Sequence, residues 1–395
     1  AKLNTMSGGP VVTPTPTPGT GGLTVSNTTQ PANSLAVWKA ASLPFTKVVF
    51  TAGASDVVVN SVTVERTGLA NDAAFAGVVL LDENGTRMGI ARTFNSNHQV
   101  VLADPFTVKA GTSKTITVAG DMETTAGGYA GQVASLTIVG VNTSATVSGA
   151  FPITGASHTI NESLTIGTVS SVAVSSFDPG TGVSKNIGDT NVRFSGIRIT
   201  AGSGEDISIK SIKWNQTGSA GSGDLANVVT IVNGVSYPTV VSADGKYYTS
   251  SFGSGITVAK GNNLDIYIQG DLIGSGSVSR TVIFDIYKTT DLNVVGLTYG
   301  YGITPPTAGT APGTRSTTSA SAFTTGSPWF FGIQTTISAG SATTIQKSAS
   351  VPAQNIAVNV PNQPLGAFET NMKGEAINIS GMTLTIATSS GFVLG

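Results

Sequence analysis

Short runs of alternating apolar and polar residues dominate the chain and predict β-strands rather than helices. One run, "DVVVNSVTVE" at residues 56–65, slips by one position between Val59 and Val62. The same slip recurs in "DISIKSIKWN" (residues 206–215) and in "AINISGMTLT" (residues 376–385). Because side chains alternate between the faces of a sheet, a one-residue slip moves the apolar set to the other face. The slip therefore predicts a β-sandwich whose strand either contains a β-bulge or bends from one sheet to the other at this point.

A long internal repeat supports this interpretation. The segment "FTVKAGTSKTITVAGDM" (residues 106–122) matches "ITVAKGNNLDIYIQGDL" (residues 256–272) at a constant separation of 150 positions. A third copy begins near residue 328, and its slipping strand follows that of the second copy by 170 positions. The third copy stops where the other two continue, so we expect it to be incomplete in this chain and to be completed by a continuation or by a strand from another subunit.

Turn residues and linkers divide the chain into units. Asn84-Gly85 and Asn233-Gly234 separate apolar runs and predict β-hairpins. Alternating Thr-Pro near the N-terminus predicts an extended linker. The expected organisation is a Thr/Pro-rich linker at 1–22, β-sandwich domain 1 at 23–160, β-sandwich domain 2 at 161–305, a linker or long loop at 306–327, and the incomplete third unit at 328–395.

Composition narrows the classes of function. Charged residues make up 10% of the chain and the formal net charge is −1, which argues against nucleic-acid binding and against a polybasic membrane anchor. The chain has no cysteine and no apolar run of about 18 residues that would span a bilayer. It also contains no nucleophile elbow, phosphate loop or zinc motif. The two histidines, His98 and His158, have no counterpart in the other copy, and we expect each to be solvent-facing or locally hydrogen-bonded.

Two carboxylates are repeated. Asp121 and Asp271 each follow a glycine at the end of the same strand in the two copies. One interpretation is that each caps a turn by accepting backbone N–H groups. The alternative is a Ca²⁺ site, because this ion prefers carboxylate and carbonyl oxygens.

Six Asn-x-Ser/Thr triplets are candidate glycosylation sites in an exported protein. Their asparagines are Asn27, Asn84, Asn142, Asn161, Asn215 and Asn378.

Repeat units of the form "LTVS…FTKVVFTAGASDVVVNSVTVERTG…FTVKAGTSKTITVAGDM" resemble those of large surface-layer-like, cell-envelope proteins of candidate-phylum bacteria. The start "AKLNTMSGG" is similar to the end of the peptidoglycan-binding domain that precedes the Thr/Pro linker in such proteins. The resemblance implies tandem immunoglobulin-like β-domains in an all-β chain at the extracellular cell surface. It implies attachment to peptidoglycan only through an upstream domain that is missing here, and no catalytic residue.

These observations favour a non-enzymatic structural protein that self-assembles into a surface layer or filament. Its expected partners are further copies of itself, bound through lateral or strand-exchange contacts. The alternative is an adhesin or glycan-binding array, which would need exposed aromatic residues. Trp38, Trp214 and Trp329 are the only tryptophans, and Trp214 occupies an expected core position. Tyr247 and Tyr248 could form an exposed pair. A polysaccharide-active enzyme is disfavoured because no convincing carboxylate pair is present.

Overall fold

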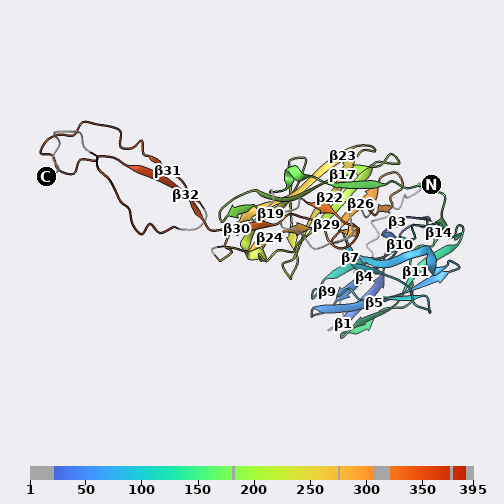
Figure 1. Cartoon of the computed structure of the whole chain (residues 1–395). Helices are drawn as coiled ribbons and strands as arrows, with labels where there is room; N and C mark the ends of the chain where they lie inside the picture. The colour runs from blue at the N-terminus through green and yellow to red at the C-terminus, as the bar shows by residue number, and fades with distance from the viewer. Residues whose placement is uncertain (1–21, 180–182, 275, 307–320, 374–376, 388–395) are drawn as a thin grey trace, which may run out of the picture. The chain divides into compact units, whose positions relative to one another are not determined.

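The computed structural model consists of β-strands joined by turns and short 3-10 helices, and its described part contains no α-helix (Figure 1). The linker expected at residues 1–22 lies outside the described part apart from Gly22, as does most of the loop expected at 306–327. The residues that the structure describes are 22–179, 183–274, 276–306, 321–373 and 377–387.

Chain contacts group these residues into two compact units. Unit 1 contains the residues up to Thr168 together with Ala201–Ile209 and Asn293–Thr304. Unit 2 contains Val169–Thr200, Lys210–Leu292 and the residues from Pro305 onward. The grouping differs from the expected boundary near residue 160, because two later segments associate with the first part of the chain.

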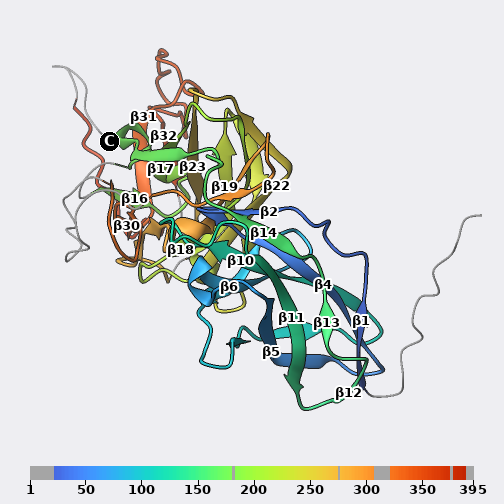
Figure 2. The same ribbon diagram turned by 90° about the vertical axis from the view of Figure 1, so that its right-hand side faces the viewer.

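Unit 1 is a sandwich of two mainly antiparallel sheets (Figure 2). In the first sheet the strand order is β12 (Thr146–Ser148), β1 (Gly22–Asn27), β4 (Leu43–Ala52), β10 (Ser113–Met122), β6 (Phe75–Leu81), β7 (Arg87–Arg92). In the second it is β2 (Leu35–Val37), β14 (His158–Asn161), β11 (Val133–Thr143), β5 (Val57–Gly68), β8 (Gln99–Leu102), with β13 (Ile153–Thr154) beside β11 and β9 (Phe106–Val108) beside β5. Smaller elements are η1 (Asp72–Ala74), β3 (Ala40–Ala41), β26 (Leu292–Gly296) and β27 (Gly302–Ile303).

Aromatic side chains join the two sheets of unit 1. Phe50 on β4 meets Phe106 on β9 edge to face, with ring centroids 5.2 Å apart. Phe45, also on β4, contacts the ring of His158 on β14 at 4.5 Å. Both phenylalanines are fully buried, so the core lies between the sheets, as expected for a sandwich.

The slip in β5 is a β-bulge. Asn142 of β11 pairs with Ser61 and the next residue, Thr143, pairs with Val59, so Asn60 is the extra residue. Val57 and Val59 before the bulge and Val62 and Val64 after it are buried. On its other edge β5 pairs with β9 before the bulge and with β8 after it. The bulge therefore keeps both halves of the strand facing the core, which confirms one of the two interpretations of the sequence pattern.

Unit 2 repeats the sandwich. One sheet has the order β15 (Val169–Ala173), β17 (Val192–Ala201), β23 (Asn263–Leu272), β19 (Leu225–Val232), β20 (Val235–Pro238). The facing strands in unit 2 are β21 (Val240–Val241), β22 (Tyr247–Val258), β18 (Ile207–Gln216) and β25 (Phe284–Asp285). The remaining elements are β16 (Ser184–Asn186), β24 (Thr281–Val282), β28 (Ala322–Phe323), β29 (Phe330–Phe331), β30 (Thr335–Ser338), η2 (Ser175–Phe177), η3 (Ser222–Asp224) and η4 (Thr289–Asp291).

The repeat found in the sequence is also a structural repeat. β10 and β23 span corresponding residues 150 positions apart, and so do η1 and η3. The expected hairpins are present: β6 pairs with β7 around Asn84-Gly85, and β19 pairs with β20 around Asn233-Gly234. The all-β class of tandem immunoglobulin-like sandwiches is therefore confirmed.

The region expected to form the third unit is divided. Residues 328–338 belong to unit 2, where Trp329 and Phe330 are buried and β30 pairs with β16 and β24. After them, β31 (Ser341–Lys347) and β32 (Phe368–Lys373) form a two-stranded ribbon (Figure 1). Residues 377–387 form no strand in the described structure, so the third slipping strand expected there is not observed.

Candidate functional site

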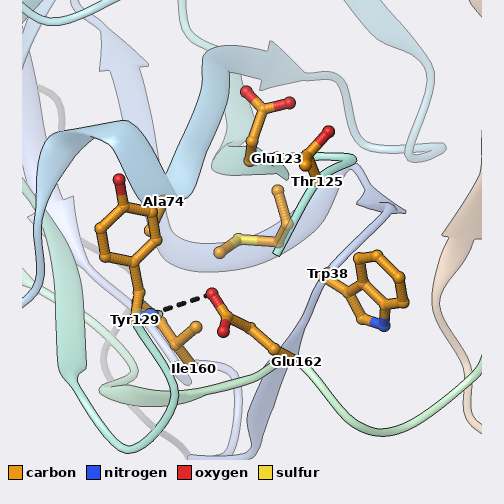
Figure 3. Close-up of a pocket in the computed structure, with 8 residues that line it drawn as sticks. Trp38, Ala74, Glu123, Thr125, Tyr129, Ile160 and Glu162 are labelled. Carbon is orange, nitrogen blue, oxygen red and sulfur yellow. Dashed lines mark hydrogen bonds between the residues drawn. The ribbon is translucent and has the colours of Figure 1, made fainter. Parts of the chain in front are cut away.

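A shallow pocket lies in unit 1 where the end of β10, the β10–β11 loop and the end of β14 meet (Figure 3). It holds about 200 Å³ of empty space, part of it open to solvent. Met122 and Ile160 form its apolar floor and are buried. Its walls are Trp38, Ala74, Glu123, Thr125, Tyr129 and Glu162.

Glu162 holds the loop that forms one wall. Its carboxylate accepts the backbone N–H groups of Tyr129 at 2.9 Å, Gly127 at 3.0 Å and Gly128 at 3.1 Å. These hydrogen bonds, that from Tyr129 foremost, lower the pKa of Glu162 below its usual value. The carboxylate is thus ionised and already engaged, which suits a structural role.

The pocket is bounded by two half-buried aromatic rings. Figure 3 shows Tyr129 and Trp38 on opposite sides of Glu162. The Trp38 indole Nε1–H donates to the carbonyl of Leu164 at 3.0 Å, which fixes the ring. The Lys39 ammonium lies 3.8 Å from the ring centroid and covers one face. The site offers aromatic surface and acceptor oxygens, the groups that hold a small polar ligand such as a sugar.

Asp121 and Asp271 occupy equivalent positions, each the next-to-last residue of its strand, β10 and β23 respectively. Asp121 accepts the backbone N–H of Ser42 at 2.8 Å, and Asp271 accepts that of Asn191 at the same distance. Ser42 and Asn191 have positive φ angles of 52° and 53° and directly precede β4 and β17. Each aspartate therefore stabilises a left-handed turn at the start of a strand.

The calcium alternative does not fit these contacts. Asp121 also forms an ion pair with the guanidinium of Arg87, and Asp271 accepts the side-chain amide of Asn227 at 2.6 Å. The oxygens of both carboxylates therefore already accept hydrogen bonds from N–H groups. A Ca²⁺ site instead needs carboxylate oxygens surrounded by further oxygen ligands. Among the described residues no cluster of three or more histidines or carboxylates is arranged for a metal.

The histidines serve local structure. His158 is buried; its Nδ1 accepts the backbone N–H of Ser34 and its Nε2 lies 3.0 Å from the carbonyl of Pro44. Burial lowers the pKa of His158, so the ring is held neutral. His98 is exposed and lies 2.6 Å from the carboxylate of Asp72. Burial raises the pKa of Asp72, but hydrogen bonds from His98 and Arg66 outweigh this and lower it.

The other sequence candidates are placed as follows. Trp214 is fully buried, with its Nε1–H donating to Thr230 Oγ1 at 3.1 Å, and Tyr248 is buried against Phe284, so these residues form no exposed platform. Asn215 is 8% exposed, which removes it as an accessible glycosylation site in the folded protein. Asn161 is half-buried and accepts two backbone N–H groups of the following turn. The exposed candidates are Asn27, Asn84, Asn142 and Asn378.

Sequence reasoning missed a buried carboxylate, Glu205. It is 2% exposed, and it accepts the backbone N–H groups of Gly167 at 2.7 Å, Thr298 at 2.8 Å and Tyr299 at 3.2 Å. Its segment, "GSGED" at residues 202–206, has the pattern of a simple hairpin turn. Since its three donors come from segments far apart in the sequence, no local pattern could have identified the role.

Comparison with known proteins gives no family. No protein-family model matches the sequence, and no curated protein matches it significantly. The chain shows distant likeness to the C-terminal domain of the Streptococcus pyogenes antigen I/II-family protein AspA, with 8% identity and a TM-score of 0.22 over 80% of this chain and 100% of that one. The C-terminal domain of the Streptococcus agalactiae AgI/II polypeptide BspA is similar with 11% identity and a TM-score of 0.19 over 66% of this chain and 95% of that one. The major pilin SpaD of Corynebacterium diphtheriae is similar with 10% identity and a TM-score of 0.19 over 71% of this chain and 63% of that one. Likeness at these TM-scores carries no argument about function. No described helix has the length and apolar character that crossing a membrane requires.

Proposed function

We propose that this chain is a non-enzymatic extracellular structural protein whose repeated sandwiches assemble into a surface layer or filament on a bacterial cell envelope. The observation that carries the proposal is the repetition of one sandwich at a spacing of 150 residues, with the same strands, turns and capping aspartates. Tandem copies of one module lengthen the molecule and present the same contact surface at each repeat, as a layer or filament requires.

The polar groups of the described residues support this proposal. Asp121 and Asp271 cap turns, Glu162 and Glu205 hold loops through backbone N–H groups, and the buried His158 is neutral. Each of these groups is engaged in a structural contact. Catalysis by a general acid and base needs such groups free to reach a substrate.

The surface is also suited to contact between copies. Charged residues are only 10% of the chain and nearly balance, so neighbouring molecules repel one another little. On β20 and β21, Val235 and Val240 are 54% and 75% exposed beside sheet edges. Apolar edge strands of this kind are competent to pair with other chains.

Electron microscopy of the purified protein tests the proposal. Ordered sheets or fibres, formed equally with and without Ca²⁺, are the expected result. A protein that stays dispersed at every concentration and salt condition would refute self-assembly by this chain.

The pocket of Figure 3 favours a second candidate function, glycan binding by an adhesin. Trp38 would supply the stacking surface and Glu123 acceptor oxygens. A glycan array followed by titration of the bound sugar tests it: Trp38→Ala should abolish binding, whereas Trp329→Phe, at a buried position in unit 2, should leave it unchanged. Equal binding by Trp38→Ala would exclude this pocket.

A further inference from the structure

The turn of the hairpin β19–β20 exposes an asparagine and the glycine that follows it. The two strands pair up to Val232 and Val235, so Asn233 and Gly234 alone make the turn. Both have left-handed backbones, with φ angles of 50° and 77°, as a two-residue type I′ turn requires. Both are also exposed. The turn therefore presents the Asn233 carboxamide and the Gly234 nitrogen to solvent.

No other group holds these two atoms in place. In the part of the chain that the structure describes, neither the Gly234 N–H nor the Asn233 carboxamide forms a hydrogen bond. A Cβ atom at Gly234 would meet no other atom within 4 Å, so the space around this residue is open. Glycine itself has no Cβ that would hinder the approach of its nitrogen to a neighbouring group. The Gly234 nitrogen is therefore free to turn toward the side-chain carbonyl carbon of Asn233.

The other Asn-Gly turn, between β6 and β7, is hydrogen-bonded. The Gly85 N–H donates to the backbone carbonyl of Asp82 at 3.0 Å. The Asp82 carboxylate accepts the N–H groups of Asn84 at 2.9 Å and of Thr86 at 2.8 Å. The Gly85 nitrogen can lose its proton and turn toward the Asn84 side chain only after its hydrogen bond opens. The two turns share the same residue pair, but the structure leaves only one of them free to react.

We infer that Asn233 is a site of spontaneous modification, at which the hairpin converts its own asparagine to isoaspartate with water as the only co-reactant. The Gly234 nitrogen loses its proton to hydroxide and bonds to the side-chain carbonyl carbon of Asn233. The carboxamide nitrogen takes a proton from water and leaves as ammonia, so a cyclic imide remains. Water then opens this ring. Opening at the main-chain carbonyl gives isoaspartate, whose peptide link runs through the side chain, and opening at the other carbonyl gives aspartate.

The modification changes the sheet edge that β20 forms. Isoaspartate adds one carbon to the backbone of the turn, and either product places a carboxylate next to Val235, which is 54% exposed. Because the length of a two-residue turn sets the register of its strands, the added atom disturbs the pairing of Val232 with Val235. The new charge also repels the same charge on a neighbouring copy. A role in limiting assembly as the protein ages rests on the proposed function.

Peptide mapping by mass spectrometry of the folded 395-residue chain, kept in mildly alkaline buffer, tests the inference. Isoaspartate should accumulate at Asn233 roughly 5-fold faster than at Asn84, the factor that corresponds to one backbone hydrogen bond. Asn227 is the control within the same molecule. Its φ angle is 49°, but Val228 follows it and its carboxamide donates to Asp271, so it should stay intact. In urea, which releases both turns, the rates at Asn233 and Asn84 should converge. Equal rates in the folded chain, or an unchanged ratio in urea, would overturn the inference.

Two variants separate the modification from its effect on assembly. Asp82→Ala removes the acceptor of two N–H groups and should accelerate conversion at Asn84 while leaving Asn233 unchanged; an unchanged rate at Asn84 would contradict protection by these hydrogen bonds. Asn233→Gly keeps a residue that adopts positive φ and removes the carboxamide. In electron microscopy, aged Asn233→Gly should assemble like fresh protein, whereas aged unmutated protein should assemble less; equal loss in both would refute the link to assembly. If the fresh chain does not assemble, the proposed function fails, while the mass measurement still decides whether Asn233 is modified.

Discussion

Glu205 offers a direct test of how a buried carboxylate holds distant segments of unit 1 together. In Glu205→Gln the side-chain amide keeps one acceptor oxygen and turns an NH₂ group toward backbone donors. Because the three N–H groups divide between the two carboxylate oxygens, at least one of them loses its acceptor. A buried N–H group without an acceptor costs about 1–3 kcal/mol. A cost of about 2 kcal/mol corresponds to a roughly 30-fold increase in local opening.

Hydrogen exchange measured by mass spectrometry is the appropriate assay, because it separates local opening from unfolding of the whole chain. Peptides containing Gly167, Thr298 and Tyr299 should exchange roughly 30-fold faster in Glu205→Gln, while peptides from β23 stay unchanged. Glu83→Gln removes the same charge at an exposed turn position and serves as the control. Exchange in Glu205→Gln equal to that of the control would refute the argument that the carboxylate secures these segments.

Three further predictions concern other features of unit 1 and the repeated turns. Burial lowers the pKa of His158 in the folded protein, so as the pH falls below about 6.5 the histidine of the unfolded chain takes up a proton first. The free energy of unfolding should therefore decrease there by up to about 1.4 kcal/mol per pH unit. Thermal melts across pH should show a flatter profile for His158→Gln; an unchanged profile would contradict a neutral buried ring. Deleting Asn60 removes the extra residue of the bulge and places Val57, Val59, Val62 and Val64 in regular alternation on the core face, so urea titration should show a loss no larger than about 3 kcal/mol; a larger loss would mean that the bulge itself is needed to position the strand. Calcium should leave the melting temperature within about 2 °C of its value in EDTA, since N–H donors surround both turn aspartates; a larger, saturable increase would restore the metal interpretation.

The elements that could be predicted were those specified by local patterns. The bulge in β5 followed from a phase slip within ten residues, and the hairpins at Asn84-Gly85 and Asn233-Gly234 followed from turn chemistry. Capping of a turn by Asp121 and Asp271 was one of the two interpretations of the sequence, and it is the one observed. It could be predicted because capping needs only a nearby backbone N–H group.

Features that depend on distant segments were not predictable in the same way. Arg87 reaches Asp121 because β7 and β10 are both packed on β6, a relation that no spacing in the sequence reveals. His158 is buried because the carbonyl of Pro44 and the N–H of Ser34 meet its ring from over a hundred residues away. The start of the third copy was placed too early, since residues 328–338 alternate like a new strand but fill the core of unit 2.

Two sandwiches with the same strand order in one polypeptide face a sorting problem while they fold, because a strand of one could insert into the other. The side chains at matching places differ in volume: Val64 of β5 corresponds to Trp214 of β18, and both are wholly enclosed. A hybrid containing β18 in the first sandwich would have to fit an indole where an isopropyl group belongs, and the reverse hybrid would leave a void. Such size differences between neighbouring repeats give each strand a preference for its own sandwich. The chain can therefore contain several copies of one fold without exchange of strands between them.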